Sequence, residues 1–218
     1  MRRLPDATLF LPPFLPLFLP LFLLLPDPDQ DLWIFGYGSL MWRPGFPWRE
    51  RVPARLTGLH RGLCVYSFVH RGTPEKPGLV LGLDRGGACR GIAYRVAAAD
   101  REAVVAYLRA REQVTSVYLE TIRRVILAGT PARHVAALTY VVDRSHIQYA
   151  GRLALDRQVE LVLQGHGRSG RNLEYVLSTV AEIEAQGCHD VGLSAIAHRL
   201  REVAGGPLAP SAGGAQEP

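Results

Sequence analysis

The chain has 218 residues, of which 48% are hydrophobic and 21% are charged, and its mean hydropathy is +0.05. This composition is too apolar for an intrinsically disordered protein, and the length suits one domain with an extension. The three cysteines, Cys64, Cys89 and Cys188, are far apart and form no C-x-x-C pair. They exclude a disulfide scaffold and a cysteine-based metal site, and they favour a reducing compartment. We therefore expect a cytoplasmic protein.

The net charge of +5 and the isoelectric point near 9.4 suggest a nucleic-acid partner at first sight. Of the 25 basic residues, however, only Lys76 is a lysine, and the arginines are spread along the chain. Acidic residues alternate with them, as in Asp100-Arg101-Glu102. Charges of both signs in alternation do not form a phosphate-binding surface. We therefore expect no nucleic-acid partner.

Residues 9–25 contain only Leu, Phe and Pro and follow the basic start Met1-Arg2-Arg3. Such a run is similar to a signal peptide or a membrane-spanning helix. Prolines at positions 12, 13, 16 and 20 would interrupt a helix, no A-x-A cleavage site follows, and a bilayer helix needs ~20 residues. We predict a disordered low-complexity extension over residues 1–30, a folded domain over 31–204 and a flexible tail over 205–218. The alternative for the extension is a membrane-associating segment, which we do not expect.

From residue 32 onward the pattern predicts strands first and helices last. Short apolar and β-branched runs between Gly/Pro turns predict strands, and apolar residues at helical spacing predict helices. The predicted strands are residues 33–35, 52–59, 63–68, 79–83, 91–96, 117–127 and 135–142, and the predicted helices are residues 101–112, 155–164, 172–186 and 191–203. This order predicts an α+β fold with a curved, mostly antiparallel sheet and flanking C-terminal helices.

The first candidate for chemistry is the glycine-rich loop after the first predicted strand. Its residues are Gly36, Tyr37, Gly38, Ser39, Leu40 and Met41. Two glycines around one residue let the backbone turn sharply and approach a ligand, and successive N–H groups can then bind a carboxylate or an oxyanion. The alternative interpretation is a plain turn that ends the strand.

The second candidate is Glu112, near the end of the predicted helix over residues 101–112. Val105 and Leu108 precede it by seven and four residues, so the three side chains share a helix face. Burial and the negative end of the helix dipole would both raise the pKa of this carboxyl group towards the range of a general acid or base. The alternative is a solvated residue at a fraying helix end.

The third candidate, residues 165–170, has the G-x-G-x-x-G spacing of a dinucleotide-binding loop. The segment before it reads as a helix rather than a strand, and the 48 residues after Gly170 are too few for the required βαβ units. A glycine-rich link between two helices is the better interpretation, so we expect no cofactor.

The seven histidines show no H-x-H or H-E-x-x-H spacing, and Ser39 lies in no G-x-S-x-G turn. We accordingly expect neither a metal site nor serine-hydrolase chemistry.

Several of these segments together resemble the ChaC-like gamma-glutamylcyclotransferases, the glutathione-specific branch of that family. The similarity extends from about residue 32 to residue 203, and its motifs occur in the same order. Residues 1–30 and the last fifteen depart from it. The segments that carry it are WIFGYGSLMWRPGF (33–46), HRGTPEKPGLVLGL (70–83), CRGIAY (89–94), YLRARE (107–112) and GRSGRNLEY (167–175).

The resemblance implies a gamma-glutamylcyclotransferase-like barrel and a reaction in which glutathione is cleaved to 5-oxoproline and Cys-Gly, without metal or cofactor. It implies that Glu112 is the general base and that residues 36–41 hold the γ-glutamyl group. Arg111 is expected to point away from the site and to serve structural pairing, and Tyr118 and Tyr149 are equally pocket or core residues. Two other functions stay open: a cyclotransferase for other γ-glutamyl amines, and a non-catalytic module that binds γ-glutamyl groups or peptides.

Overall fold

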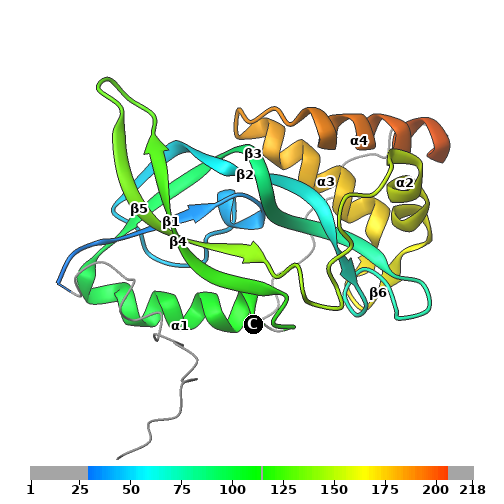
Figure 1. Ribbon diagram of the computed structural model, residues 1–218, viewed down its shortest axis with the longest axis horizontal. Coiled ribbons are helices and arrows are strands. Elements are labelled where there is room, and N and C mark those ends of the chain that lie inside the picture. Colours follow the sequence, from blue (N-terminus) through cyan, green and yellow to red (C-terminus); the bar gives the residue numbers. More distant parts are fainter. Residues whose placement is uncertain (1–28, 114, 206–218) are drawn as a thin grey trace, which may run out of the picture.

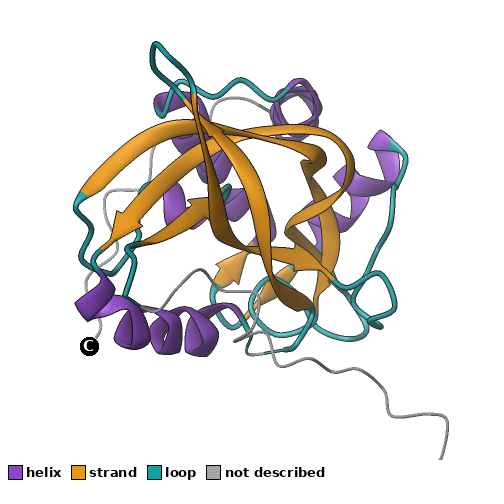
Figure 2. Ribbon diagram, turned by 60° about the vertical axis from the view of Figure 1, so that its left-hand side comes forward, coloured by secondary structure: helices purple, strands orange, loops and turns teal. Residues whose placement is uncertain are grey.

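A computed structural model of the protein describes residues 29–113 and 115–205, so most of the predicted extension and tail lie outside the described residues. Five strands form a closed barrel in the order β1-β3-β2-β4-β5 (Figures 1 and 2). Neighbouring strands are antiparallel except β1 and β5, which pair in parallel and close the barrel. The predicted curved, mostly antiparallel sheet is confirmed. The strands are β1 (Leu32–Gly36), β2 (Glu50–Ser67), β3 (Gly78–Val96), β4 (Tyr118–Leu127) and β5 (Arg133–Val142).

Four strands predicted between residues 52 and 96 are in fact two long ones, β2 and β3, and the predicted division is wrong. The pair runs without interruption from Glu50 opposite Arg95 to Ser67 opposite Gly78, with a register shift at Gly58 and another near Cys64. Gly58 has a φ of +86°. A glycine with positive φ lets an extra residue bulge out of the ladder and bend the strand without ending it. Gly58, which lies inside the predicted strand 52–59, therefore bends one continuous hairpin.

The four helices begin where the sequence predicts and end within one residue of the predicted ends. They are α1 (Arg101–Glu112), α2 (Leu155–Gln164), α3 (Asn172–Ala185) and α4 (Val191–Ala204). α2, α3 and α4 pack on one another and on the β2–β3 hairpin, whereas α1 lies apart from them, below the barrel in Figure 1. The described residues also include two short 3-10 helices, η2 (Ser39–Met41) and η3 (Ala98–Asp100).

The G-x-G-x-x-G segment links α2 and α3, as expected, through a small hairpin of β6 (His166–Gly167) and β7 (Gly170–Arg171). The backbone of this hairpin lies against the loop after β2, with Arg168 N donating to Val69 O at 2.8 Å. A Cβ atom on Gly167 would come within 2.5 Å of Val69 O. The spacing of these glycines therefore serves close backbone packing rather than phosphate binding.

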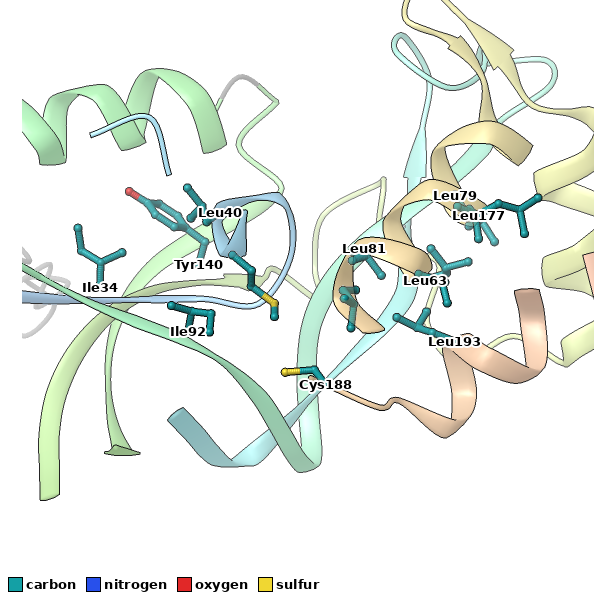
Figure 3. Close-up of a cluster of buried hydrophobic side chains, with 14 of the residues drawn as sticks. Ile34, Leu40, Leu63, Leu79, Leu81, Ile92, Tyr140, Leu177, Cys188 and Leu193 are labelled. Atoms are coloured by element: carbon teal, nitrogen blue, oxygen red, sulfur yellow. The ribbon is translucent and has the colours of Figure 1, made fainter. Parts of the chain in front are cut away.

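Buried apolar side chains form a core that extends from the barrel interior to the C-terminal helices (Figure 3). Ile34 of β1 and Ile92 of β3 lie at the barrel end of this cluster, and Leu177 of α3 and Leu193 of α4 lie at the helical end. Leu79, from the first part of β3, packs beside Leu177. Because the long strand β3 contributes to both ends, the core fixes the helices relative to the barrel.

Asn172, the first residue of α3, is fully buried and pairs with the backbone of β3. Its Oδ1 accepts a hydrogen bond from Leu79 N at 2.7 Å, and its Nδ2 donates to Leu79 O at 2.8 Å. The side-chain amide thus takes the place of a neighbouring strand at this position. It joins α3 to the barrel by satisfying two buried polar groups.

The substitution N172L should lower the free energy of unfolding by about 2–6 kcal/mol, because two buried backbone groups lose their partners at about 1–3 kcal/mol each. Urea unfolding followed by circular dichroism measures this change. S178A on the same helix is the matched control, since its hydroxyl bonds only to carbonyls of its own helix; it should shift stability by less than about 0.5 kcal/mol. Equal unfolding midpoints for the two variants would contradict the proposed role of Asn172.

Candidate active site

A cavity in the described part of the barrel brings the glycine-rich loop and Glu112 together. It has a volume of about 90 Å³ and lies where the C-terminal end of α1 meets the loop that follows β1. The loop, four strands and two helices contribute to its wall. The lining residues are Phe35, Tyr37, Gly38, Ser39, Leu40, Leu81, Glu112, Tyr118, Tyr140 and Tyr175. Two segments that are more than 70 residues apart in the sequence therefore share one small chamber.

Glu112 is the last residue of α1 and the acidic residue of this lining. Val105 and Leu108, the residues predicted to share its helix face, are both buried, and the side chain of Glu112 itself is 20% exposed. Burial raises the pKa of Glu112 above its ordinary value, and the Arg111 guanidinium acts in the opposite direction. A carboxylate with a raised pKa inside a cavity has the properties of a general base.

Arg111 serves structural pairing, as expected, but the expectation that it points away from the site is wrong. Its Nε lies 3.2 Å from Glu112 Oε1, its Nη2 donates to Ser39 Oγ at 2.7 Å, and its Nη1 donates to Arg43 O at 2.7 Å. Successive helical residues do diverge by about 100° at the backbone. The long side chain bends back, however, and ties the end of α1 to the loop after β1.

The structure separates the six loop residues into two groups. Tyr37, Gly38, Ser39 and Leu40 line the cavity, whereas Gly36 and Met41 do not. Gly36 ends β1, and a Cβ atom on it would come within 2.9 Å of Leu40 Cβ, so glycine is needed there for the turn. Met41 is fully buried, and its carbonyl accepts a hydrogen bond from Tyr94 at 2.8 Å. These two residues shape the loop from behind.

The backbone N–H groups of Gly38, Ser39 and Leu40 donate no hydrogen bond to another residue within the described ranges. The carbonyls of the same turn are occupied, since Gly38 O accepts from Met41 N and Ser39 O accepts from Arg43 N, each at 2.8 Å. Adjacent N–H groups without a partner, at the wall of a cavity, suit a carboxylate or a developing oxyanion.

Three tyrosines of the lining, Tyr118, Tyr140 and Tyr175, are not among the predicted site residues. Tyr118 donates its hydroxyl proton to Leu81 O at 2.6 Å, and Tyr140 donates to Glu120 Oε2 at 3.1 Å. The third, Tyr175, accepts from Leu81 N at 3.4 Å. Burial raises the pKa of all three phenols, so each stays protonated. With their protons already committed, Tyr118 and Tyr140 can only accept a hydrogen bond from a ligand.

The sequence held a partial signal for these tyrosines. The sequence allows Tyr118 as either a pocket or a core residue, and Tyr118 lines the cavity. Tyr140 and Tyr175 follow ordinary strand and helix patterns. Tyr149, considered with Tyr118, lies instead in a separate groove, where it donates to Asp84 Oδ2 at 2.8 Å.

Among the described residues, no group of three or more His, Cys, Asp or Glu side chains is arranged to hold a metal ion. Within the same residues, no helix combines the length and the hydropathy needed to cross a membrane.

The sequence of this domain matches the profile of the ChaC-like protein family over residues 32–203. That match covers most of the chain, including the loop and Glu112. The chain belongs to the ChaC-like family. Its domain accordingly carries a gamma-glutamylcyclotransferase-like fold, with a five-stranded barrel and C-terminal helices.

Named relatives of this ChaC-like protein occur in bacteria and animals. It is 34% identical over 168 residues to a glutathione-specific gamma-glutamylcyclotransferase of Escherichia coli (strain K12), covering 77% of this chain and 72% of the relative. It is 35% identical over 150 residues to glutathione-specific gamma-glutamylcyclotransferase 1 of Homo sapiens, covering 68% of each chain.

Solved structures share the fold at lower sequence identity. A crystal structure of a gamma-glutamyl cyclotransferase specific to glutathione from yeast superposes with a TM-score of 0.69 at 21% identity. The superposition covers 80% of this chain and 97% of the yeast chain.

The substitution E112Q should stabilise the fold at pH 7–8, because it removes a charge that burial disfavours. The folded-state pKa of Glu112 is raised, so the wild-type penalty is present above that pKa and disappears as the pH falls towards the unfolded-state value. Thermal unfolding of both proteins from pH 4 to pH 8 measures the difference. The expectation would be contradicted if E112Q were less stable than wild type at neutral pH and the difference in melting temperature did not change with pH.

Proposed function

We propose that this ChaC-like protein is a glutathione-specific gamma-glutamylcyclotransferase, which cleaves glutathione to 5-oxoproline and Cys-Gly. The observation that carries the proposal is the cavity that the half-buried Glu112 shares with the N–H groups of the loop. The names of the relatives in Escherichia coli and Homo sapiens support glutathione as the substrate.

The proposed reaction is an intramolecular aminolysis. The α-amino nitrogen of the γ-glutamyl group attacks its own γ-amide carbon, the new C–N bond closes a five-membered ring, and the bond to the cysteine nitrogen breaks. An α-ammonium group cannot attack until it loses a proton. Glu112 takes that proton as general base, and the same nitrogen loses a second proton as the lactam forms. The departing amine gains two protons and leaves as the ammonium group of Cys-Gly, so no net proton is consumed.

The charge pattern of the cavity suits one orientation of a γ-glutamyl group. The lining offers donors at the N–H groups of Gly38, Ser39 and Leu40, and acceptors at Glu112, Tyr118 and Tyr140. We place the α-carboxylate on the loop N–H groups and the α-ammonium on the acceptor side, beside its base. A curled substrate held in this way has its amine close to its amide carbon, and such orientation can contribute about 7–11 kcal/mol.

The small volume of the cavity, about 90 Å³, favours one amino-acid-sized group over a whole tripeptide. The γ-glutamyl half therefore enters, and Cys-Gly leaves from the open side.

The unit that carries this activity is residues 31–204, from just before β1 to the end of α4. The buried free thiols of Cys64, Cys89 and Cys188 suit a reducing, cytoplasmic environment, and the proposed partner is the small-molecule substrate.

Purified protein incubated with reduced glutathione should release 5-oxoproline and Cys-Gly in equal amounts, as measured by mass spectrometry. E112Q should lower kcat at least about 100-fold, the scale of a lost general base, while the circular dichroism spectrum stays unchanged. Turnover of other γ-glutamyl amines without turnover of glutathione would keep the mechanism and change the substrate. Equal kcat values in E112Q and wild type would overturn the role of Glu112.

The value of kcat/KM should fall on the acid side with a pKa higher than that of an ordinary glutamate, because the base must be ionised and burial raises its pKa. R111M should move this limb to still higher pH, since the Arg111 guanidinium lowers the pKa of Glu112. Rate profiles from pH 4 to pH 8 test both statements. An acid limb at the same pH in R111M and wild type would show that another group controls it.

A further inference from the structure

Arg61 is a charged residue in the middle of β2, yet its side chain is only 2% exposed. It is not among the residues that line the cavity, and it contributes instead to the separate groove that contains Tyr149. A guanidinium group is rarely buried unless partners compensate for the lost water. The partners of Arg61 therefore indicate what the residue does.

The guanidinium group of Arg61 reaches three parts of the fold. Its Nη1 donates to Tyr37 O, at the start of the part of the loop that lines the cavity, and lies 3.4 Å from Sδ of Met41, the residue just after that part. Its Nη2 donates to Arg90 O of β3 at 3.2 Å. Its Nε lies 3.5 Å from Asp190 Oδ2, the residue that caps α4. The side chain is thus fixed by β3 and α4 and holds the loop.

The contact with Tyr37 O determines the direction of the next N–H group. Tyr37 O and Gly38 N–H belong to one planar trans peptide unit, so they point in opposite directions. With the carbonyl held by Arg61 behind the loop, Gly38 N–H is directed to the other side, where Gly38 lines the cavity. Gly38 has no Cβ and resists a rotation of this peptide unit only weakly. The unit therefore needs an external restraint.

We propose that Arg61 is a positioning residue for the substrate loop: by holding Tyr37 O, it keeps Gly38 N–H directed at the ligand. The inference rests on the proposed function, in which that N–H group binds the γ-glutamyl α-carboxylate. Arg61 contacts no reacting atom in this scheme. Its loss weakens substrate binding, whereas the loss of Glu112 slows the chemical step.

R61M removes the donors and keeps the length of the side chain, and R61K keeps a charge that cannot reproduce the planar fork. We expect KM for glutathione to rise about 10- to 100-fold in R61M, the range of one hydrogen bond to a charged group, with a smaller change in kcat. R61K should lie between R61M and wild type. R55K, an exposed arginine on the same strand, is the matched control and should leave both constants unchanged.

D190N separates loop positioning from the attachment of α4, because Asn still caps a helix but does not form the ion pair. A KM increase in D190N as large as that in R61M would overturn the proposal, as would wild-type KM values in both Arg61 variants. Crystal structures of wild type and R61K add a readout that needs no turnover. Arg61 is confirmed as the restraint if Tyr37 O turns in the variant and is rejected if it does not, even when wild type cleaves no γ-glutamyl compound and the proposed function itself fails.

Discussion

The placement of β1 determines the geometry of the whole site. This strand has only five residues, but both of its edges are paired, antiparallel to β3 and parallel to β5, so it closes the barrel. The loop leaves β1 at Gly36, and a Cβ atom on Gly91 of β3 would come within 2.3 Å of Gly36 O. Because the two backbones are in such close contact, the exit of the strand has little freedom. The loop therefore starts from a fixed point beside the end of α1.

The order and type of the elements follow from the sequence because local patterns determine them. α1 and α2 have the predicted boundaries, since their apolar residues recur at helical spacing and both helices are short. The β2–β3 hairpin was less accessible to prediction. Gly58 lies inside the predicted strand 52–59, whereas Gly86 and Gly87 fall between two predicted strands. Only pairing across β2 and β3 shows that all three adopt positive φ within one bent ladder. Sequence proximity cannot reveal such pairing.

The candidate site was predictable in part for the same reason. The loop and Glu112 each carry a local signature, a glycine pair and an acidic residue at a helix end, and the family resemblance joined them. Tyr140 and Tyr175 have no such signature, because a tyrosine on a strand or helix usually belongs to the core. Their position in the cavity depends on the closure of the barrel and on the docking of α3 through Asn172. These are long-range contacts that no single segment encodes.

Three arginines hold the cavity wall from outside, and each uses its planar group on an oxygen that must stay in place. Arg111 donates a hydrogen bond to Ser39 Oγ, and Arg61 donates one to Tyr37 O. Arg109 donates two hydrogen bonds to the Glu120 carboxylate, of 3.0 and 2.8 Å. Glu120 in turn accepts a hydrogen bond from the hydroxyl group of Tyr140. The donors and acceptors of the cavity wall are thus held by charged side chains that are not among the residues lining the cavity. The arginines are spread evenly along the chain, so their positions in the sequence do not indicate a role. Their function depends on where the fold places them rather than on clustering in the sequence.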